Sequence, residues 1–237
     1  MKRTTVGTHN EATRAAWLEK TLAAVPPGSR ILDAGAGEQQ WRRACAHLDY
    51  VSQDFGRYDG AGDGVGLQMG SWDQSRLDII SDITAIPRPD ASFDAVLCVE
   101  VLEHLPRPDR AIAEFARLLR PGGRLILTAP FCSLTHFAPF HFYSGFNRYF
   151  YETQLGASGF EILEISPNGN FFEYLAQELR RVKEMAGRYP VDRPRPWERL
   201  ALRAVLRMLE RFSRRGGESN EILCFGYHVL ARKRARD

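Results

Sequence analysis

The sequence lacks three features that would each place it in a specialised class of protein. Its four cysteines, Cys45, Cys98, Cys132 and Cys224, form no CxxC pair, which argues against a zinc ribbon and a thioredoxin-type motif. No apolar run approaches the roughly 18 residues of a membrane-spanning helix, and no apolar segment of a signal peptide follows the charged N-terminus. We therefore expect a cytoplasmic protein without disulfides, and we predict no metal site.

A strong net charge is also missing. The 32 basic and 29 acidic side chains leave a formal charge of +3, too small a surplus to bind nucleic acid by charge alone. The basic residues gather after Arg180, and arginine recurs every four residues on an amphipathic segment between Arg195 and Arg215. We interpret this segment as a solvated helix face or a dimer contact. Binding to an anionic membrane surface or an acidic carrier protein is the second interpretation, and no nucleic acid partner is expected.

The sequence does contain enough apolar residues for a large core, since 44% of its 237 residues are hydrophobic. Short apolar segments alternate with helical patterns, and this alternation predicts parallel pairing with helices on both faces. The predicted strands are residues 30–34, 50–54, 77–82, 93–99, 123–129, 160–165 and 222–230. We therefore expect an α/β fold, a doubly wound, Rossmann-like, seven-stranded and mostly parallel sheet, with a helical insertion before the last strand.

We expect a single domain over residues 1–237. Its predicted parts are a capping helix at 11–27, a cofactor-binding core at 28–165 with a lid at 131–151, a helical insertion at 170–219 and a last strand at 220–232. Further helices are predicted over residues 38–48 and 110–120. Residues 55–74 hold six glycines, a composition that predicts a long loop, and we expect this loop and the lid to be mobile without ligand.

Ligands of open parallel sheets bind at the carboxyl ends of the strands, so the residues at those ends are the candidate site. Asp33 ends the first predicted strand and runs into a turn with Gly35 and Gly37, which lets a ligand approach the backbone. Asp54 ends the second strand, where a carboxylate can accept both hydroxyls of a ribose. A dinucleotide fingerprint would need glycine at Gln40, and the Asp33 carboxylate would repel a pyrophosphate.

Four motifs occur in a specific order: residues 31–37, Asp82 with Ile83 upstream of Pro87, residues 92–105, and residues 119–123. Together they resemble the class I S-adenosylmethionine-dependent methyltransferases, in particular the small-molecule (type 11) group related to ubiquinone-pathway enzymes. The resemblance covers roughly residues 28–165 and implies an antiparallel last strand. One departure is Gln39, where the family often has a third glycine.

The resemblance implies a role for each residue of the S-adenosylmethionine site. Asp33 and the backbone from Gly35 to Gly37 would hold the methionine end of the cofactor, and Asp54 would hold the ribose. Asp82 and the backbone of Ile83 would bracket the adenine, and Glu100 would lie near the sulfonium. The cofactor-binding residues expected on this basis are Asp33, Gly35, Gly37, Asp54, Asp82, Ile83 and Glu100.

The predicted lid, residues 131–151, is rich in aromatic side chains and is typical of a pocket wall that excludes water. It carries His136, His141 and Tyr143, the candidate catalytic residues, each of which could accept the proton of an attacking group. His104 is interpreted instead as a packed residue. The expected reaction is transfer of the methyl group of S-adenosylmethionine to an oxygen or nitrogen of a small-molecule acceptor.

Two other classes of function are weighed against this one. A non-catalytic or regulatory protein could bind S-adenosylmethionine without turnover, but a lid that bears histidines and aromatic rings argues against a mere binder. A nicotinamide-dependent oxidoreductase shares the sheet and the acid for the ribose, but Gln40 in place of glycine argues against it.

Overall fold

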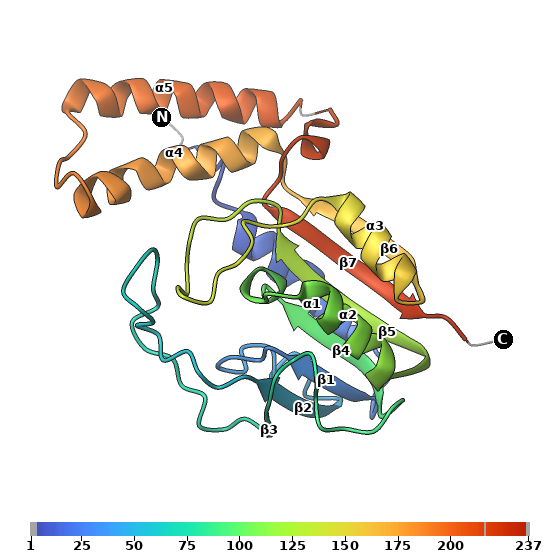
Figure 1. The fold of residues 1–237 in the computed structure, drawn as a ribbon. Coiled ribbons are helices and arrows are strands. Elements are labelled where there is room, and N and C mark those ends of the chain that lie inside the picture. The colour runs from blue at the N-terminus through green and yellow to red at the C-terminus, as the bar shows by residue number, and fades with distance from the viewer. Residues whose placement is uncertain (1–3, 216, 236–237) are drawn as a thin grey trace. The chain divides into compact units, whose positions relative to one another are not determined.

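The structure is a computed structural model that describes residues 4–215 and 217–235, and Figure 1 shows its path. The described chain divides into two compact units. The sheet unit comprises residues 16–166 and 226–235, and the helical unit comprises residues 4–15 and 167–225. The expectation of a single methyltransferase domain over residues 1–237 stays a prediction.

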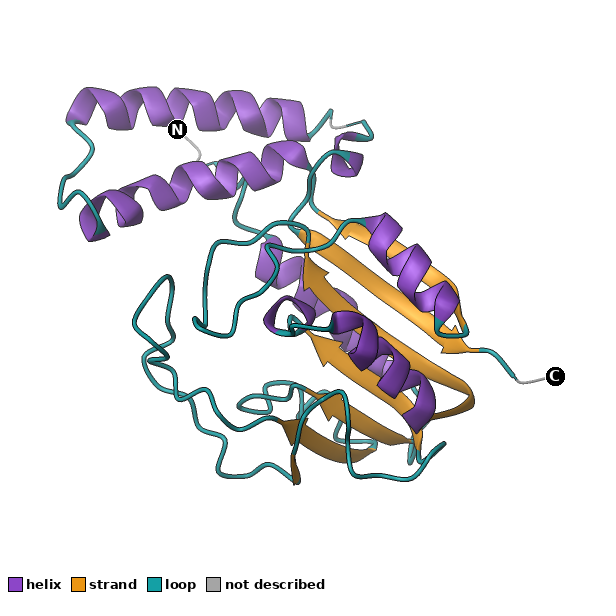
Figure 2. Ribbon diagram, viewed as in Figure 1, coloured by secondary structure: helices purple, strands orange, loops and turns teal. Residues whose placement is uncertain are grey.

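A seven-stranded sheet, drawn as orange arrows in Figure 2, has the order β3-β2-β1-β4-β5-β7-β6 within the described residues. Its strands are β1 Arg30–Ala34, β2 Asp49–Asp54, β3 Ile79–Ile80, β4 Phe93–Val99, β5 Leu119–Pro130, β6 Phe160–Asn168 and β7 Gly226–Lys233. The pairs from β3 to β5 are parallel, and β7 pairs antiparallel with β5. The predicted fold class is therefore confirmed, and so is the antiparallel last strand.

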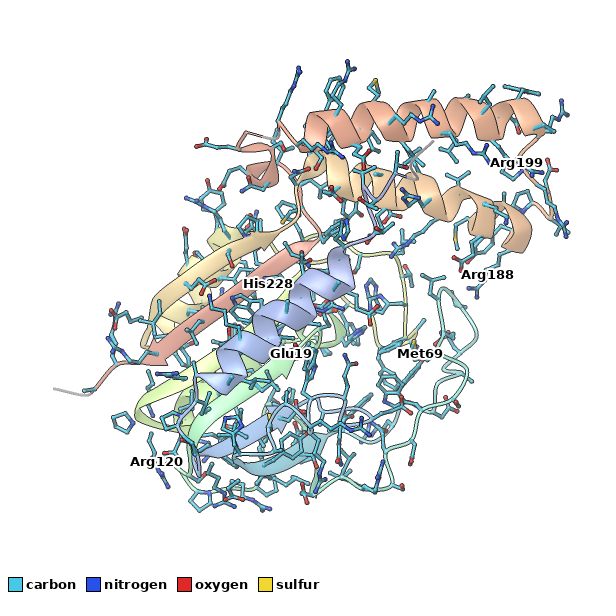
Figure 3. The ribbon with its side chains drawn as sticks, turned by 180° about the vertical axis from the view of Figure 1, so that it is seen from behind. Glu19, Met69, Arg120, Arg188, Arg199 and His228 are labelled. Carbon is cyan, nitrogen blue, oxygen red and sulfur yellow. The ribbon has the colours of Figure 1, made fainter. Side chains whose placement is uncertain are left out.

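Helices lie on both faces of the sheet. The helical elements are α1 Asn10–Ala23, the 3₁₀ turn η1 Leu102–His104, α2 Pro108–Leu118, α3 Arg148–Ala157, α4 Phe171–Arg188, α5 Pro196–Ser213 and the 3₁₀ turn η2 Ser219–Glu221. Figure 1 shows α2 and α3 on the face nearer the viewer, and the reversed view of Figure 3 brings forward α1, on which Glu19 is labelled. No helix in the described part of the chain is both long and apolar enough to cross a bilayer.

The core beneath α1 joins helix and sheet. Leu18 and Leu22 of α1 are fully buried against Ile31 of β1 and Leu97 of β4. The Trp17 ring stacks on His228 of β7 with ring centroids 5.0 Å apart. Burial of this apolar area, worth about 25 cal/mol per Å², holds β1 and β4 at the centre of the sheet, where the candidate site begins.

Several predicted elements differ from the observed ones. The helix predicted over residues 38–48 is wrong, because Gln39 adopts a left-handed φ of 61° and residues 37–47 form successive turns. The third strand is only two residues long, and the last strand begins at Gly226 instead of residue 222. Helix α3 was not predicted, since its first turn lies within the aromatic segment assigned to the lid.

The helical unit is built on the pair α4 and α5, which run antiparallel. Asn170 caps α4 and its amide donates to the Ser213 carbonyl at the end of α5. Figure 3 labels Arg188 and Arg199 at the opposite end of the pair. Gly7 lies against α4, because a Cβ at this position would be 2.4 Å from the Gln177 backbone nitrogen. The predicted helical insertion is therefore a packed helix pair.

Candidate functional site

The strand order reverses between β1 and β4, so this point of the sheet is the expected ligand site. In the parallel register, Asp33 of β1 lies beside Ser52 of β2 on one side and Leu97 of β4 on the other. Asp54 ends β2, and Glu100 follows the last residue of β4. The structure thus brings the predicted acids to one edge of the sheet.

The turn after β1 requires glycine because the protein itself packs against it. Gly35 and Gly37 have φ values of +78° and +51°, in the left-handed region that favours glycine. A Cβ on Gly35 would lie 2.5 Å from the Val101 side chain, and one on Gly37 would lie 2.6 Å from the Trp72 ring. The sequence analysis predicted the two glycines but assigned no contact to Val101, which lies within the motif of residues 92–105, or to Trp72 of the glycine-rich loop.

Gln39 takes the place of the glycine that the resemblance led us to expect. Its φ of 61° is the conformation in which glycine is unstrained. The side-chain amide donates to the Arg76 carbonyl at 2.5 Å and to Ser52 Oγ at 3.2 Å. These contacts tie the turn to the neighbouring segments, so the turn keeps its shape without a third glycine.

Asp54 is buried and its carboxylate is held by two backbone groups. Gly37 N–H donates to Oδ2 at 3.0 Å and Gly56 N–H donates to Oδ1 at 3.2 Å. A carboxylate has about four lone-pair sites, so each oxygen retains a site that can accept from a hydroxyl. These acceptor sites fit the two hydroxyls of a ribose. We refer to Asp33, Gly35, Gly37 and Asp54 as the strand-end cluster.

Asp33 lies beneath the glycine turn, with only 2% of its surface exposed. The Tyr50 hydroxyl donates to Asp33 Oδ2 at 2.5 Å. Burial raises the pKa of Asp33 to about 7, and the nearby Asp54 charge acts in the same direction, while the Tyr50 hydrogen bond opposes both. Tyr50, which the sequence analysis did not single out, therefore favours the charged form of Asp33 against the larger effect of burial.

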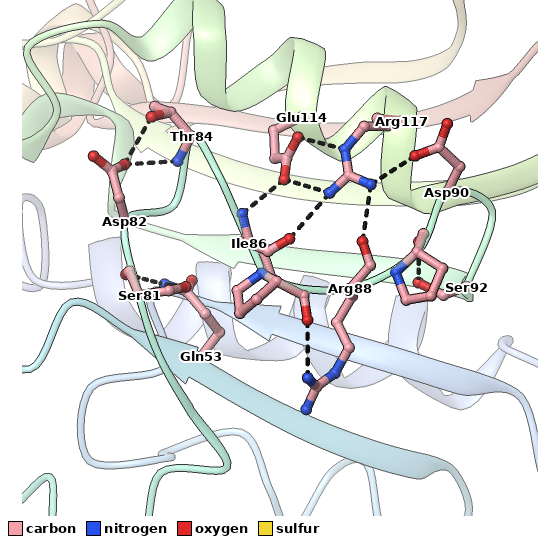
Figure 4. Close-up of polar contacts among 12 residues, drawn as sticks. Gln53, Ser81, Asp82, Thr84, Ile86, Arg88, Asp90, Ser92, Glu114 and Arg117 are labelled. Atoms are coloured by element: carbon pink, nitrogen blue, oxygen red, sulfur yellow. Dashed lines mark hydrogen bonds and ion pairs between the residues drawn. The ribbon is translucent and has the colours of Figure 1, made fainter.

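Asp82 and Ile83 follow β3, as expected. Figure 4 shows Asp82 Oδ1 accepting from both the backbone N–H and the hydroxyl of Thr84, each at 2.8 Å. These hydrogen bonds lower the pKa of Asp82, and because both engage Oδ1, Oδ2 can accept from an exocyclic amine. Ile83 is buried. The pair therefore has the groups that an adenine would need.

Glu100 follows β4 in a conformation that is uncommon for glutamate, with a φ of +55°. Its backbone N–H donates to the Thr128 carbonyl at 2.9 Å, and Thr128 Oγ1 donates back to Glu100 Oε1 at 2.8 Å. Strained backbone of this kind persists where its surroundings fix it, often at functional sites. Thr128 of β5 is a residue that the sequence analysis missed.

The glycine-rich loop and the lid, both predicted as mobile segments, contact each other. Leu67 N–H donates to the Thr135 carbonyl at 2.9 Å, and Phe137 N–H donates to the Leu67 carbonyl at 3.0 Å. The Phe137 ring stacks on Tyr58, with ring centroids 4.4 Å apart, and lies edge-on to Trp72. Together these rings form an apolar wall beside the glycine turn, while the mobility of both segments stays a prediction.

A second group of polar side chains gathers where β4 and β5 end. It comprises Glu103, His104, His136 and His141, which we call the histidine cluster. His136 lies with its ring centroid 4.6 Å from that of His104 and 4.9 Å from that of His141. Burial lowers the pKa of His104 to about 3 and also lowers the pKa of His141.

The third catalytic candidate, Tyr143, makes its contacts elsewhere. Its hydroxyl donates to the Pro106 carbonyl at 3.3 Å, and its ring lies against Phe146. Tyr143 also lines a cavity of about 540 Å³ together with Arg107, Asn147 and Phe150. The structure thus brings two of the three candidates together and joins them to His104, which the sequence analysis had interpreted as a packed residue.

Comparison with known proteins matches residues 32–127 to a family described as a methyltransferase domain. The chain is 31% identical over 178 residues to a demethylmenaquinone methyltransferase of Beutenbergia cavernae, covering 72% of this chain and 67% of that protein. It is 34% identical to the protein of the same name from Renibacterium salmoninarum, covering 65% of this chain and 60% of that protein. The match thus spans less than two thirds of that relative.

Two further matches concern a shorter stretch of sequence and the fold. A ubiquinone biosynthesis O-methyltransferase of Xanthomonas oryzae pv. oryzae is 36% identical over 107 residues, covering 43% of each chain. The crystal structure of an S-adenosylmethionine-dependent methyltransferase from Archaeoglobus fulgidus has the same fold, with a TM-score of 0.58, 17% identity and 94% coverage of both chains.

The chain belongs to the S-adenosylmethionine-dependent methyltransferase family, in its ubiquinone and menaquinone branch. S-adenosylmethionine is the methyl donor of this family, and Asp54 of the strand-end cluster has the acceptor sites that the ribose hydroxyls would need. The family resemblance found in the sequence is confirmed, and the nicotinamide-dependent alternative is set aside.

Proposed function

We propose that the protein transfers the methyl group of S-adenosylmethionine to a hydroxyl oxygen of an aromatic, quinol-type small molecule. The family supports the methyl donor, and the names of the relatives support the acceptor class. The ring wall of Tyr58, Trp72 and Phe137 supports an aromatic acceptor as well, because offset and edge-on ring pairs are each worth about 0.5–1.5 kcal/mol.

In this proposal, Asp54 holds the ribose, Asp82 and Ile83 hold the adenine, and Asp33, Gly35, Gly37 and Glu100 surround the methionine end. The cofactor supplies a methyl group on a positively charged sulfur. The protein aligns the acceptor with that methyl group and excludes water, and alignment alone can supply about 7–11 kcal/mol. A hydroxyl nucleophile also has to lose its proton, which is where the histidines enter.

The main support for a methyl acceptor with a hydroxyl group is the hydrogen bonding of His141. Ser133 Oγ lies 2.9 Å from the Ser144 carbonyl, which can only accept, so the single Ser133 hydroxyl proton points to that carbonyl. Ser133 Oγ then accepts from His141 Nε2, at 3.2 Å. His141 Nδ1 keeps a lone pair, and we assign this nitrogen as the acceptor of the hydroxyl proton.

Two measurements test the proposal together. Calorimetry should detect binding of S-adenosylmethionine and of S-adenosylhomocysteine, and formation of S-adenosylhomocysteine should be followed with a panel of catechols, hydroquinones and matched aromatic amines. We expect turnover with hydroxylated rings and none with the amines. Binding without turnover on the whole panel would favour a regulatory protein, and turnover with the amines alone would remove the proton acceptor from the mechanism.

A further inference from the structure

Glu103, His104 and His136 converge on one point at the carboxyl ends of β4 and β5. The Nε2 atom of His104 lies 3.7 Å from Glu103 Oε1, and the Nε2 atom of His136 lies 4.0 Å from the same oxygen. One ligating atom from each of the three side chains can be chosen so that all lie within 4.8 Å of one another. Glu103 is 1% exposed, so its carboxylate faces this point from within the protein.

The backbone fixes the tautomer of both rings. His104 Nδ1 lies 2.6 Å from the Phe140 carbonyl, and His136 Nδ1 lies 2.8 Å from the Leu134 carbonyl. A carbonyl oxygen only accepts, so each Nδ1 carries a proton, and in its neutral form each ring presents the lone pair of Nε2. Metal-ligating histidines show the same arrangement, in which the second ring nitrogen donates to a carbonyl or a carboxylate.

A cation between these three side chains would interact favourably with the Glu103 carboxylate and with both Nε2 lone pairs. His104 Nε2 is buried and has no hydrogen-bond partner among the residues that the structure describes. Bonds of about 2.1 Å to a tetrahedral ion separate ligand atoms by about 3.4 Å. The two Nε2 atoms lie 3.7 and 4.0 Å from Glu103 Oε1 and the ligand atoms lie within 4.8 Å of one another, so an ion would draw the three side chains closer together. His136 can supply this shift, because its side chain is partly exposed.

We propose that Glu103, His104 and His136 form a binding site for a divalent transition-metal ion of the zinc class. Two imidazoles and one carboxylate are a ligand set that Zn²⁺ and Fe²⁺ accept, whereas Mg²⁺ prefers oxygen ligands. Three protein ligands leave a coordination position open. On the proposed function, that position would suit the acceptor hydroxyl, whose pKa a metal ion lowers.

The lid is already held in place for such a site. Phe142 and Tyr143 donate their backbone N–H groups to the Glu103 carbonyl at 2.9 and 3.2 Å. The contact between His104 and the Phe140 carbonyl adds a third tie between η1 and the lid. A site whose supporting groups are fixed before binding loses less entropy when the ion enters.

Zinc titration of the full, untagged chain tests this site without reference to catalysis. The protein is stripped with EDTA, dialysed and titrated with Zn²⁺ against a chromophoric chelator, and Co²⁺ is then added to record its visible absorption. We expect one Zn²⁺ per chain and a tetrahedral Co²⁺ spectrum. We expect His136→Asn and Glu103→Gln to weaken Zn²⁺ binding by more than about 100-fold, since loss of an outer-shell partner alone costs 10- to 100-fold.

The exposed His9 provides the control, because His9→Ala removes a histidine far from the three ligands in the sequence and should leave zinc binding unchanged. His136 is a partly exposed lid residue, so its variant should stay folded by circular dichroism even if the buried Glu103 variant does not. Absence of stoichiometric Zn²⁺ binding, or equal binding by folded His136→Asn, would overturn the site. Neither result depends on whether the protein methylates a quinol.

Discussion

The strand-end cluster and the histidine cluster occupy the same edge of the sheet but are built in different ways. The first uses a short turn and the ends of β1 and β2, with backbone N–H groups holding the Asp54 carboxylate. The second joins the turn η1 to a lid more than thirty residues later in the chain, mainly through side chains and lid carbonyls. The difference suggests that cofactor binding depends on backbone shape and acceptor chemistry on side-chain contacts.

The largest expected effect falls on the histidine cluster. His141→Asn should lower turnover by about 10²- to 10⁴-fold, because a general base contributes that much, while the affinity for S-adenosylmethionine stays unchanged. Steady-state kinetics and calorimetry measure the two quantities. Tyr143→Phe is the matched control, since the Tyr143 hydroxyl contacts the Pro106 carbonyl and should be dispensable for turnover. Near-normal turnover in the His141 variant would leave alignment as the main contribution.

The next effect falls on the turn of the strand-end cluster. Gly35→Ala should lower the free energy of unfolding by about 2–4 kcal/mol, because it adds left-handed strain and a clash with Val101. Gly122→Ala is the control, since Gly122 has nearly the same φ of +80° but no heavy atom within 4 Å of the added Cβ. Urea unfolding of both variants isolates the clash. Equal losses of unfolding free energy in the two variants would show that the clash with Val101 contributes nothing to the effect at Gly35.

A smaller effect is expected at Asp54. Asp54→Asn should weaken binding of S-adenosylmethionine by about 1.5–3 kcal/mol, the usual contribution of hydrogen bonds to a charged group. Calorimetry of the variant gives this difference directly, and Asp59→Asn, at an exposed position of the glycine-rich loop, is the control. If the two variants bind equally well, Asp54 is not a cofactor residue.

The last expected effect is of another kind, a dependence of the free energy of unfolding on pH at Asp33. The pKa of this acid is about 7 in the folded protein and 3.8 in the unfolded chain. The folded state therefore retains a proton that the unfolded chain loses between these values. The contribution of Asp33 to the free energy of unfolding is largest below about pH 4. It decreases as the pH rises through about 7. Because the unfolded chain binds one proton fewer in this range, the free energy of unfolding decreases by about 1.4 kcal/mol per pH unit.

Asp33→Asn should remove this dependence on pH. Urea unfolding of the wild type and the variant at pH 5, 6 and 7 should therefore show a free energy of unfolding that changes less with pH in the variant. The groups that act on Asp33 are the Tyr50 hydroxyl and the Asp54 carboxylate. Tyr50→Phe removes the hydrogen bond that favours the charged form and should extend the slope to higher pH. Parallel profiles for wild type and Asp33→Asn would show that Asp33 is ionised in the folded state.

The sequence by itself determined the class of fold and most of the strand-end cluster. Apolar strands alternating with helices imply parallel pairing, and the ends of parallel strands meet at one edge. Asp33, Gly35, Gly37 and Asp54 could therefore be located without coordinates. Each belongs to a short segment whose local pattern predicts its position, whereas Asp82 and Ile83 were assigned through the family resemblance.

Only the tertiary structure decided which side chains surround these residues. Val101 and Trp72 contact the turn from distant segments, and Tyr50 reaches Asp33 from the adjacent strand. The convergence of Glu103, His104 and His136 depends on the lid folding back onto η1 through backbone hydrogen bonds. No periodicity encodes such contacts, because they depend on the path of a loop with no regular structure. For the same reason, helix 38–48 failed as a prediction: the left-handed Gln39 is stabilised by Ser52 and Arg76, residues distant in the sequence.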